Sequence, residues 1–156
     1  MIFHILLNQM TTLFLGLNLL TTMTFDSEIQ SYLYGGGKDD VFFQVTNNQR
    51  TLAIRPKIEG DFSNLLVITK KQKYYFNLKY DKSSPHQFIE IKDGVMNHAL
   101  SKKISNLSYD IFEGDHSVLF VNKRDHDVTL NGKTVKRSDY FSKGVPLILE
   151  GVKILY

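Results

Sequence analysis

Acidic residues and histidines stand side by side at two places in the second half of the sequence. Asp115 precedes His116, and Asp125-His126-Asp127 follows further along the chain. A carboxylate beside an imidazole can act as a general acid–base pair, and both groups bind transition metals. None of the five histidines forms the His-x-x-x-His pair that places two imidazoles on one helix face. Because Arg124 offers Asp125 a simple ion-pair partner, we expect solvated turn residues here and no metal site.

A run of three glycines ends in a lysine at Gly35-Gly36-Gly37-Lys38. Glycine-rich loops bind phosphate when they lead into a helix whose N-terminal amides point at the anion. Here Asp39 and Asp40 follow, which would repel an anion, and the next residues have the pattern of a strand. No serine stands in a Gly-x-Ser-x-Gly elbow. We therefore expect neither enzymatic activity nor a cofactor, and a binding or assembly role is favoured.

The composition is that of a folded protein. Of the 156 residues 42% are hydrophobic and 22% are charged, which indicates one packed domain with room for a small appendage. The net charge of +3 is too small to indicate nucleic-acid binding by itself. The absence of cysteine excludes disulfides, thiolate metal sites, cysteine nucleophiles and a lipid-modified N-terminal cysteine.

The stretch before Asp26 differs from the rest of the chain because it carries no charged side chain. Its apolar run from Leu13 to Leu20 has the length found in signal peptides, and small polar residues follow at Thr21, Thr22 and Thr24. We interpret residues 1–24 as a signal peptide, which places the mature chain outside the cytoplasm. An uncleaved membrane anchor and a buried apolar strand are the alternatives.

Beyond this stretch the sequence predicts short strands separated by turn residues. The expected strands are 41–46, 51–55, 65–69, 74–80, 87–92, 118–121, 128–130, 133–135, 147–149 and 152–155. Asn131-Gly132 and Glu150-Gly151 each join two of them and are typical of tight hairpins. This spacing indicates an all-β fold, namely a small antiparallel β-sandwich with a C-terminal β-hairpin region.

One segment shows helical periodicity instead. Within 95–105, Met96, Ala99, Leu100 and Ile104 are spaced to share one helix face, which predicts a short helical connector. We therefore divide the chain into a signal peptide at 1–24, a sandwich domain at 25–93, a connector at 94–106 and a short β-rich region at 107–156.

The segment 73–80 mixes aromatic and basic residues, as do strands on which nucleic-acid bases stack. Strand alternation places Tyr74, Phe76, Leu78 and Tyr80 on one face and Tyr75, Asn77 and Lys79 on the other. The first face is that of a half-buried strand, and only Tyr75 with Lys73 and Lys79 would suit base stacking. Nucleic acid is therefore not an expected partner. The lysines at 70–73 more simply occupy a solvated turn and protect a sheet edge.

The segment 51–78 resembles the N-terminal domain of the TrbG/CagX family, the outer-membrane core-complex subunits of type IV secretion and conjugal transfer machines. The family pattern is a hydrophobic strand ending in proline, then Ser or Thr before Asn and an aliphatic strand to Thr, then a basic turn and Tyr-x-Phe-x-Leu. The matching positions are Pro56, Ser63, Asn64, Leu65, Val67, Thr69, Tyr74, Phe76 and Leu78. The resemblance extends over Phe42 to Tyr80, and the region 107–156 corresponds to a shortened C-terminal domain of the family.

The resemblance implies a structural subunit of a type IV secretion core complex that takes part in channel assembly for protein or DNA export. It implies a location in the periplasm and cell envelope, in association with the outer membrane. The implied partners are further copies in a ring, a subunit that spans from the inner to the outer membrane, and a small lipoprotein.

Two groups of residues follow from this resemblance. The candidate interface residues are Lys70, Lys71, Lys73, Tyr75 and Lys79, and the residues expected to be structural are Pro56, Asn64, Thr69, Tyr74, Phe76 and Leu78. A free-standing periplasmic binding or adaptor module that keeps the sandwich fold is the alternative function.

Overall fold

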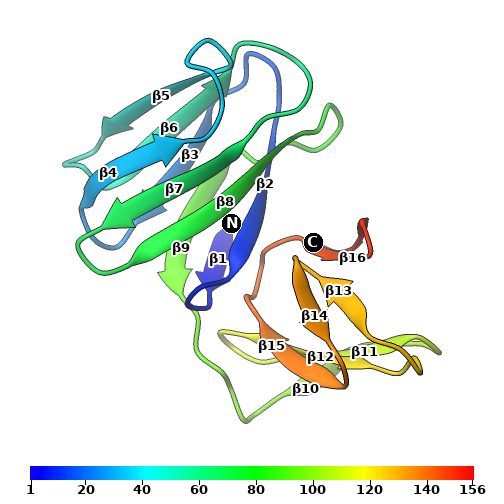
Figure 1. Cartoon of the computed structure of the whole chain (residues 1–156). Coiled ribbons are helices and arrows are strands. Elements are labelled where there is room, and N and C mark those ends of the chain that lie inside the picture. Colours follow the sequence, from blue (N-terminus) through cyan, green and yellow to red (C-terminus); the bar gives the residue numbers. More distant parts are fainter. The chain divides into compact units, whose positions relative to one another are not determined.

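The computed structural model describes residues 1–156 and consists of strands, turns and loops (Figure 1). Its strands β1 to β17 form four sheets, so the predicted all-β class is confirmed. The chain divides into two compact units. The first contains Met1–Ile2 and Met10–Lys92, and the second contains Phe3–Gln9 and Asp93–Tyr156.

The first unit is a sandwich of two sheets. One sheet contains, in spatial order, β9 (Phe88–Asp93), β3 (Thr21–Phe25), β6 (Thr51–Pro56) and β5 (Val41–Thr46), with the start of β1 (Ile2–Ile5) beside β9. The other sheet has the order β2 (Met10–Leu15), β8 (Lys73–Tyr80), β7 (Asn64–Thr69) and β4 (Ile29–Tyr34). Strands β1 and β5 are therefore the edge strands of the first sheet, and β2 and β4 are those of the second.

Most neighbouring strands of this unit are antiparallel, but some pairs are parallel. Strand β2 runs parallel to β8, and β3 runs parallel to β9. Parallel neighbours need a long connection, whereas turn residues in a sequence indicate only the antiparallel hairpins that they close. The parallel pairs could therefore not be predicted from local pattern.

The core of the first unit comes from side chains that alternate along these strands. On β8, Tyr74, Phe76 and Leu78 are at most 2% exposed, which confirms the predicted alternation. The other large core side chains of this unit include Leu13, Leu15, Met23, Phe25, Leu52, Ile54, Leu65, Val67, Ile89 and Ile91. Burial of such side chains contributes about 1.5–3 kcal/mol each to the free energy of folding.

Residues 1–24, expected to form a signal peptide, form β1, β2 and most of β3. Leu13, Leu15 and Met23 are completely buried, so the structure shows the buried-strand alternative for this segment. Burial of the inward-facing positions explains the apolar side chains of this segment, because strand alternation places every second residue in the core. The structure offers no apolar helix of membrane-spanning length.

The second unit is built from short strands in two sheets. One has the order β10 (Ser101–Ser105), β11 (Tyr109–Glu113), β12 (Val118–Asn122) and β15 (Ser138–Phe141). The other has the order β14 (Lys133–Val135), β13 (Val128–Leu130), β16 (Leu147–Leu149) and β17 (Val152–Leu155). Its core includes Ile111, Val118, Phe120, Val128, Leu130, Val135, Phe141, Val145 and Leu147.

Both predicted hairpins of the C-terminal region are confirmed. Asn131 and Gly132 join β13 to β14 with φ of 50° and 78°, and Glu150 and Gly151 join β16 to β17 with φ of 49° and 83°. Two consecutive residues with positive φ are the signature of the type I′ turn, whose twist matches that of the strands it joins.

The predicted helical connector at 94–106 is wrong. The segment 101–105 is β10, which pairs with β11, and Val95 N donates to His116 O in the loop before it. Met96, which the helical pattern assigned to an apolar face, is 63% exposed. The apolar residues here have no surface against which a helix could bury them, so pairing with β11 satisfies the backbone instead.

Candidate functional site

The turn between β7 and β8 is fixed by the hydroxyl of Thr69. Its Oγ1 accepts hydrogen bonds from Lys71 N at 3.2 Å and Gln72 N at 3.1 Å, and it donates to Gln72 O at 2.9 Å. Thr69 is only 4% exposed. A side chain that satisfies three backbone groups makes this hairpin a defined platform for the residues on its outward face.

Two lysines of this turn are paired within the chain. Lys70 Nζ lies 2.9 Å from Glu28 Oε2, and Lys71 Nζ lies 3.3 Å from Asp26 Oδ2. The hydrogen bond from Lys70 lowers the pKa of the Glu28 carboxyl. Exposed pairs of this kind contribute little to stability, because water and salt screen them. As interface candidates, Lys70 and Lys71 are therefore already partly neutralised.

The other three candidate interface residues lie on the outward face of β8. Lys73, Tyr75 and Lys79 are exposed and alternate with the buried positions, and Tyr75 is 38% exposed. No carboxylate of the structure lies within ion-pair distance of Lys73 or Lys79. These two lysines therefore keep an uncompensated charge on either side of Tyr75.

The strand register extends this face across the whole sheet. Tyr75 of β8 stands opposite Met10 of β2 and Leu66 of β7, and Leu66 stands opposite Leu33 of β4. These four side chains form one row across four strands, and Leu33 at its end is 64% exposed. We call this row, with Ile68, Lys73 and Lys79, the β8 face.

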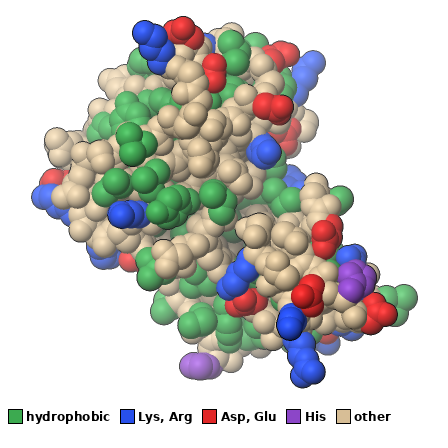
Figure 2. Space-filling view, viewed as in Figure 1, with side chains coloured by type: hydrophobic (Ala, Val, Ile, Leu, Met, Phe, Trp, Pro, Cys, Tyr) green, Lys and Arg blue, Asp and Glu red, His purple; other side chains and the backbone are tan.

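Hydrophobic side chains gather with lysine over β4, β7 and β8 in the space-filling view (Figure 2). Leu33 and Tyr75 are the exposed members of the β8 face, and Met10, Leu66 and Ile68 are half-buried. Exposed apolar patches rimmed by polar residues mark surfaces that bind other macromolecules. The sequence indicated Tyr75 and the lysines of this face. It did not indicate Met10, Leu33, Leu66 and Ile68, because their alignment depends on the register between strands.

The residues expected to be structural occupy positions that support β6 and β7. Pro56 is buried at the end of β6, where its carbonyl oxygen accepts a hydrogen bond from Asn18 N at 3.3 Å. Asn64 is exposed at the start of β7, and its backbone carbonyl accepts from Gly35 N at 2.9 Å. A Cβ on Gly35 would collide with the Asn64 amide, so this close approach requires glycine.

The residues that could have carried chemistry are not assembled into a site. His126 lies 3.0 Å from Asp125, and both side chains are exposed. The rings of His116 and His4 meet edge to face at 4.9 Å. No group of three or more His, Asp or Glu side chains is placed to hold a metal ion. In the glycine loop, the Asp40 carboxylate accepts a hydrogen bond from Gly37 N at 3.1 Å. This amide therefore already has an anionic partner within the chain.

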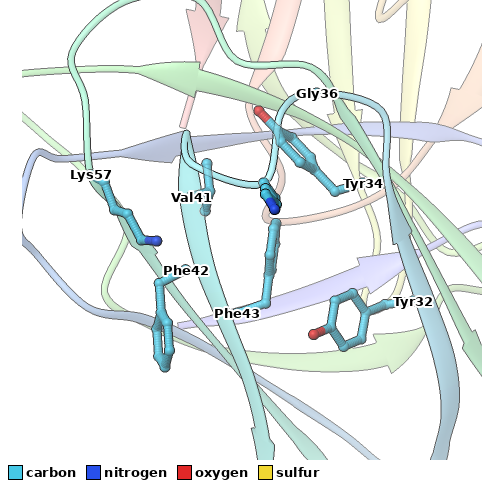
Figure 3. Close-up of a pocket in the computed structure, with 8 residues that line it drawn as sticks. Tyr32, Tyr34, Gly36, Val41, Phe42, Phe43 and Lys57 are labelled. Atoms are coloured by element: carbon cyan, nitrogen blue, oxygen red, sulfur yellow. The ribbon is translucent and has the colours of Figure 1, made fainter.

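The sequence analysis did not predict β4. It therefore also did not predict the aromatic cleft beside the glycine loop, which β4 helps to line. A cleft of about 340 Å³ is lined by Tyr32, Tyr34, Gly36, Lys38, Val41, Phe42, Phe43 and Lys57. In the close-up, Phe42 and Lys57 lie together on one side of Phe43, and Tyr32 lies on the other (Figure 3). The spacing Tyr32-x-Tyr34 before the glycines was the available signal, since it has strand periodicity.

The fold and these two surfaces define an all-β protein of two units whose first unit is a sandwich with one apolar, lysine-flanked outer face and an aromatic edge cleft. A scan against protein-family models and a search of curated proteins find no match to the chain.

Proposed function

We propose that the chain is a structural subunit of an envelope-spanning type IV secretion core complex and takes part in channel assembly for protein or DNA export. The observation that carries the proposal is the β8 face, where an apolar row crosses all four strands of one sheet. Tyr75 stands in this row with 38% of its surface exposed, between the unpaired Lys73 and Lys79.

The β8 face has the composition of a protein interface. Such interfaces combine an apolar centre containing aromatic residues with a polar rim, and Tyr is among the residues that contribute most to binding. The unpaired lysines favour a partner that brings carboxylates to the rim. A flat sheet face of this kind suits contact with a second copy in a ring or with another subunit.

The resemblance to TrbG/CagX proteins supports the same proposal. The segment that carries it forms the consecutive strands β6, β7 and β8, and its aliphatic and aromatic positions at Leu65, Val67, Tyr74 and Phe76 are buried. The proposed location is the periplasm in association with the outer membrane. The proposed partners are other core-complex subunits, including one that spans the envelope and a small lipoprotein.

The test is to tag the chain at its C-terminus in the native cell, extract the envelope in mild detergent, and measure particle size with the co-purifying proteins. We expect a large particle that contains other secretion subunits. A Tyr75→Ala and Leu33→Ser double variant should release the chain from it. The matched control is Phe88→Ala, which removes an aromatic side chain that is 74% exposed on the other sheet and should leave the particle intact. A tagged chain found entirely in the cytoplasm would contradict the proposal.

A free-standing periplasmic binding or adaptor module is the second candidate function. The observation that favours it is the aromatic cleft. Its volume of about 340 Å³ is in the range of pockets that bind small molecules. Release of a small, monomeric particle by osmotic shock would support this candidate over the first.

A further inference from the structure

Strands β4 and β5 each pair on one side only, and their other edges border the aromatic cleft. The two edges belong to different sheets of the first unit. They are joined by ring contacts, because Phe43 of β5 lies 5.3 Å from both Tyr32 and Tyr34 of β4 between ring centroids. Aromatic rings therefore close the open side between β4 and β5, and a backbone hydrogen bond closes it only at the start of β4, where Ile29 N donates to Gln49 O at 2.6 Å.

The phase of the β5 to β6 ladder determines which backbone groups of β5 face this opening. Lys57 N donates to Asp40 O at 2.8 Å, and the register then pairs Phe42 with Arg55. Bonded and non-bonded pairs alternate in an antiparallel ladder, so Phe42 and Gln44 bond to β6. The N–H and C=O groups of Val41, Phe43 and Val45 consequently point to the free edge, and the absence of an N–H on Pro56 opposite Val41 fits this phase.

Cavities accompany this edge along most of its length. The cleft of about 340 Å³ is lined by Val41, Phe42 and Phe43, and a second one of about 370 Å³ includes Val45 and Gln49. Tyr32 lines both of them. An unpaired strand edge with open space beside it can accept a further strand.

Three positive side chains beside β5 have no ion-pair partner, and two carboxylates, Asp39 and Asp40, stand directly before the strand. Lys38 and Lys57 line the cleft, and the Arg55 guanidinium lies 5.3 Å from the centre of the Phe42 ring. No carboxylate of the structure lies within ion-pair distance of these three side chains. The nearby Asp40 carboxylate is engaged by the Tyr34 hydroxyl at 3.3 Å, in addition to Gly37 N.

We propose that the free edge of β5 binds an extended segment of a partner protein in which carboxylate side chains alternate with apolar ones. The segment pairs with Val41, Phe43 and Val45 as an added strand. Strand alternation directs every second side chain toward the rings of Tyr32, Tyr34 and Phe43, and the others toward Arg55 and Lys57. Apolar groups suit the first environment and carboxylates suit the second. This inference concerns a surface other than the β8 face and does not depend on the proposed function.

The probe is a fluorescein-labelled hexapeptide of alternating valine and glutamate, titrated against the full chain by fluorescence anisotropy. We expect saturable binding. A peptide of alternating valine and lysine should not bind. A valine–glutamate peptide whose inward-facing backbone nitrogens are methylated should also fail to bind, because it keeps its charge but cannot pair as a strand. Equal binding by the methylated peptide would overturn the proposal, and so would no binding by the parent peptide.

Amide hydrogen exchange followed by NMR locates the bound segment. Peptide addition should slow exchange at the amides of Phe43 and Val45, which face the free edge. Exchange at Phe42 and Gln44 should not change, because these amides already bond to β6. Protection on the β8 face, with none on β5, would contradict the proposed position.

Charge-reversed variants test the contribution of the lysines. The double variant Lys38→Glu and Lys57→Glu should weaken peptide binding by about tenfold or more, since rim charges steer association and pair with the ligand. The double variant Lys82→Glu and Lys92→Glu makes the same change in net charge at exposed positions of the same unit and should bind as the parent does. Equal loss in both double variants would show nonspecific attraction and overturn the site. Tight binding of a labelled single-stranded oligothymidine in place of the peptide would also overturn it.

Discussion

The hydroxyl of Tyr156 donates a 2.9 Å hydrogen bond to Oε1 of Glu113, which ties the segment after β17 to β11 within the second unit. Lys103 Nζ lies 2.9 Å from the other oxygen of the same carboxylate, and Lys143 Nζ lies 3.4 Å from Oε1. Burial raises the pKa of Glu113, but the hydrogen bonds from Lys103 and Tyr156 outweigh it, so the net pKa is lowered. Burial and the bond to Glu113 raise the pKa of Tyr156 far above its ordinary value.

These shifts predict a pH dependence of stability. Because the folded-state pKa of Glu113 is lowered, its contribution is present above the ordinary value of 4.5 and is lost as the pH falls through the lowered pKa. The raised pKa of Tyr156 acts in the opposite sense: its contribution is present below the ordinary value of 10.0 and is lost as the pH rises through the folded-state pKa.

Urea titrations across the acid range check this expectation. The Glu113→Gln variant should be less stable than the parent near neutral pH and should lose less free energy of unfolding on acidification. Glu90→Gln, an exposed carboxyl on β9, serves as the control and should follow the parent. If Glu113→Gln had the same acid dependence as the parent, the Glu113 network would not stabilise the fold.

The two faces of β8 predict opposite effects of neighbouring substitutions. Phe76→Ala should lower the free energy of unfolding by about 3–5 kcal/mol, because Phe76 is completely buried and the change leaves a cavity. Tyr75→Ala should change it by less than about 1 kcal/mol, since the side chain is 38% exposed. Denaturant unfolding of both variants measures the difference. Equal destabilisation would mean that Tyr75 is a core residue.

Removal of the Thr69 hydroxyl should destabilise the β7 to β8 turn, and this effect can be separated from that of the side chain's shape. Thr69→Val keeps the shape but removes a hydroxyl that bonds to Lys71 N, Gln72 N and Gln72 O. We expect a loss of about 1–3 kcal/mol, because backbone groups near the turn lose their partner. Thr69→Ser keeps the hydroxyl and should recover most of this loss in the same thermal denaturation experiment. A serine variant as unstable as the valine variant would assign the effect to the methyl group.

Asn131 provides side-chain hydrogen bonds and also adopts a positive φ in the β13 to β14 turn. Two substitutions separate these contributions. Its side chain donates to Pro146 O at 3.1 Å and accepts from Ile148 N at 2.9 Å, and its φ is 50°. Asn131→Gly keeps the backbone freedom but loses both hydrogen bonds, at a cost of about 1–3 kcal/mol. Asn131→Ala loses the bonds and adds strain at positive φ, which costs about 1 kcal/mol more. Calorimetric melting should therefore order stability as parent, glycine variant and alanine variant, and an alanine variant more stable than the glycine variant would contradict this order.

Local sequence pattern was sufficient to predict several elements of the fold. The alternation of Tyr74, Phe76 and Leu78 predicted the buried face of β8, and Asn131-Gly132 and Glu150-Gly151 predicted two hairpins. In each case the signal lies within a few consecutive residues, and the physical cause is strand geometry or the positive φ of a tight turn.

Other features depend on contacts that local pattern does not contain. The run around Leu13 and Leu15 has the same composition whether it is a leader or a strand buried against β8, so periodicity could not distinguish the two. The helical spacing from Met96 to Ile104 was a coincidence in a segment whose partner, β11, follows later in the chain. The β8 face and the aromatic cleft arise from the register between strands and from rings on different sheets.

The position of β2 beside β8 has a consequence during synthesis on the ribosome. Phe14 N donates to the His86 ring at 2.9 Å, across a sequence separation of 72 residues. At about 5–20 residues per second, roughly 4 to 14 s of translation pass between these two residues. For most of that interval, until β8 has been made, the apolar β2 lacks the strand with which it pairs, so the nascent chain exposes an unpaired, aggregation-prone edge. Folding of the first unit is thus a late and slow event dominated by distant contacts.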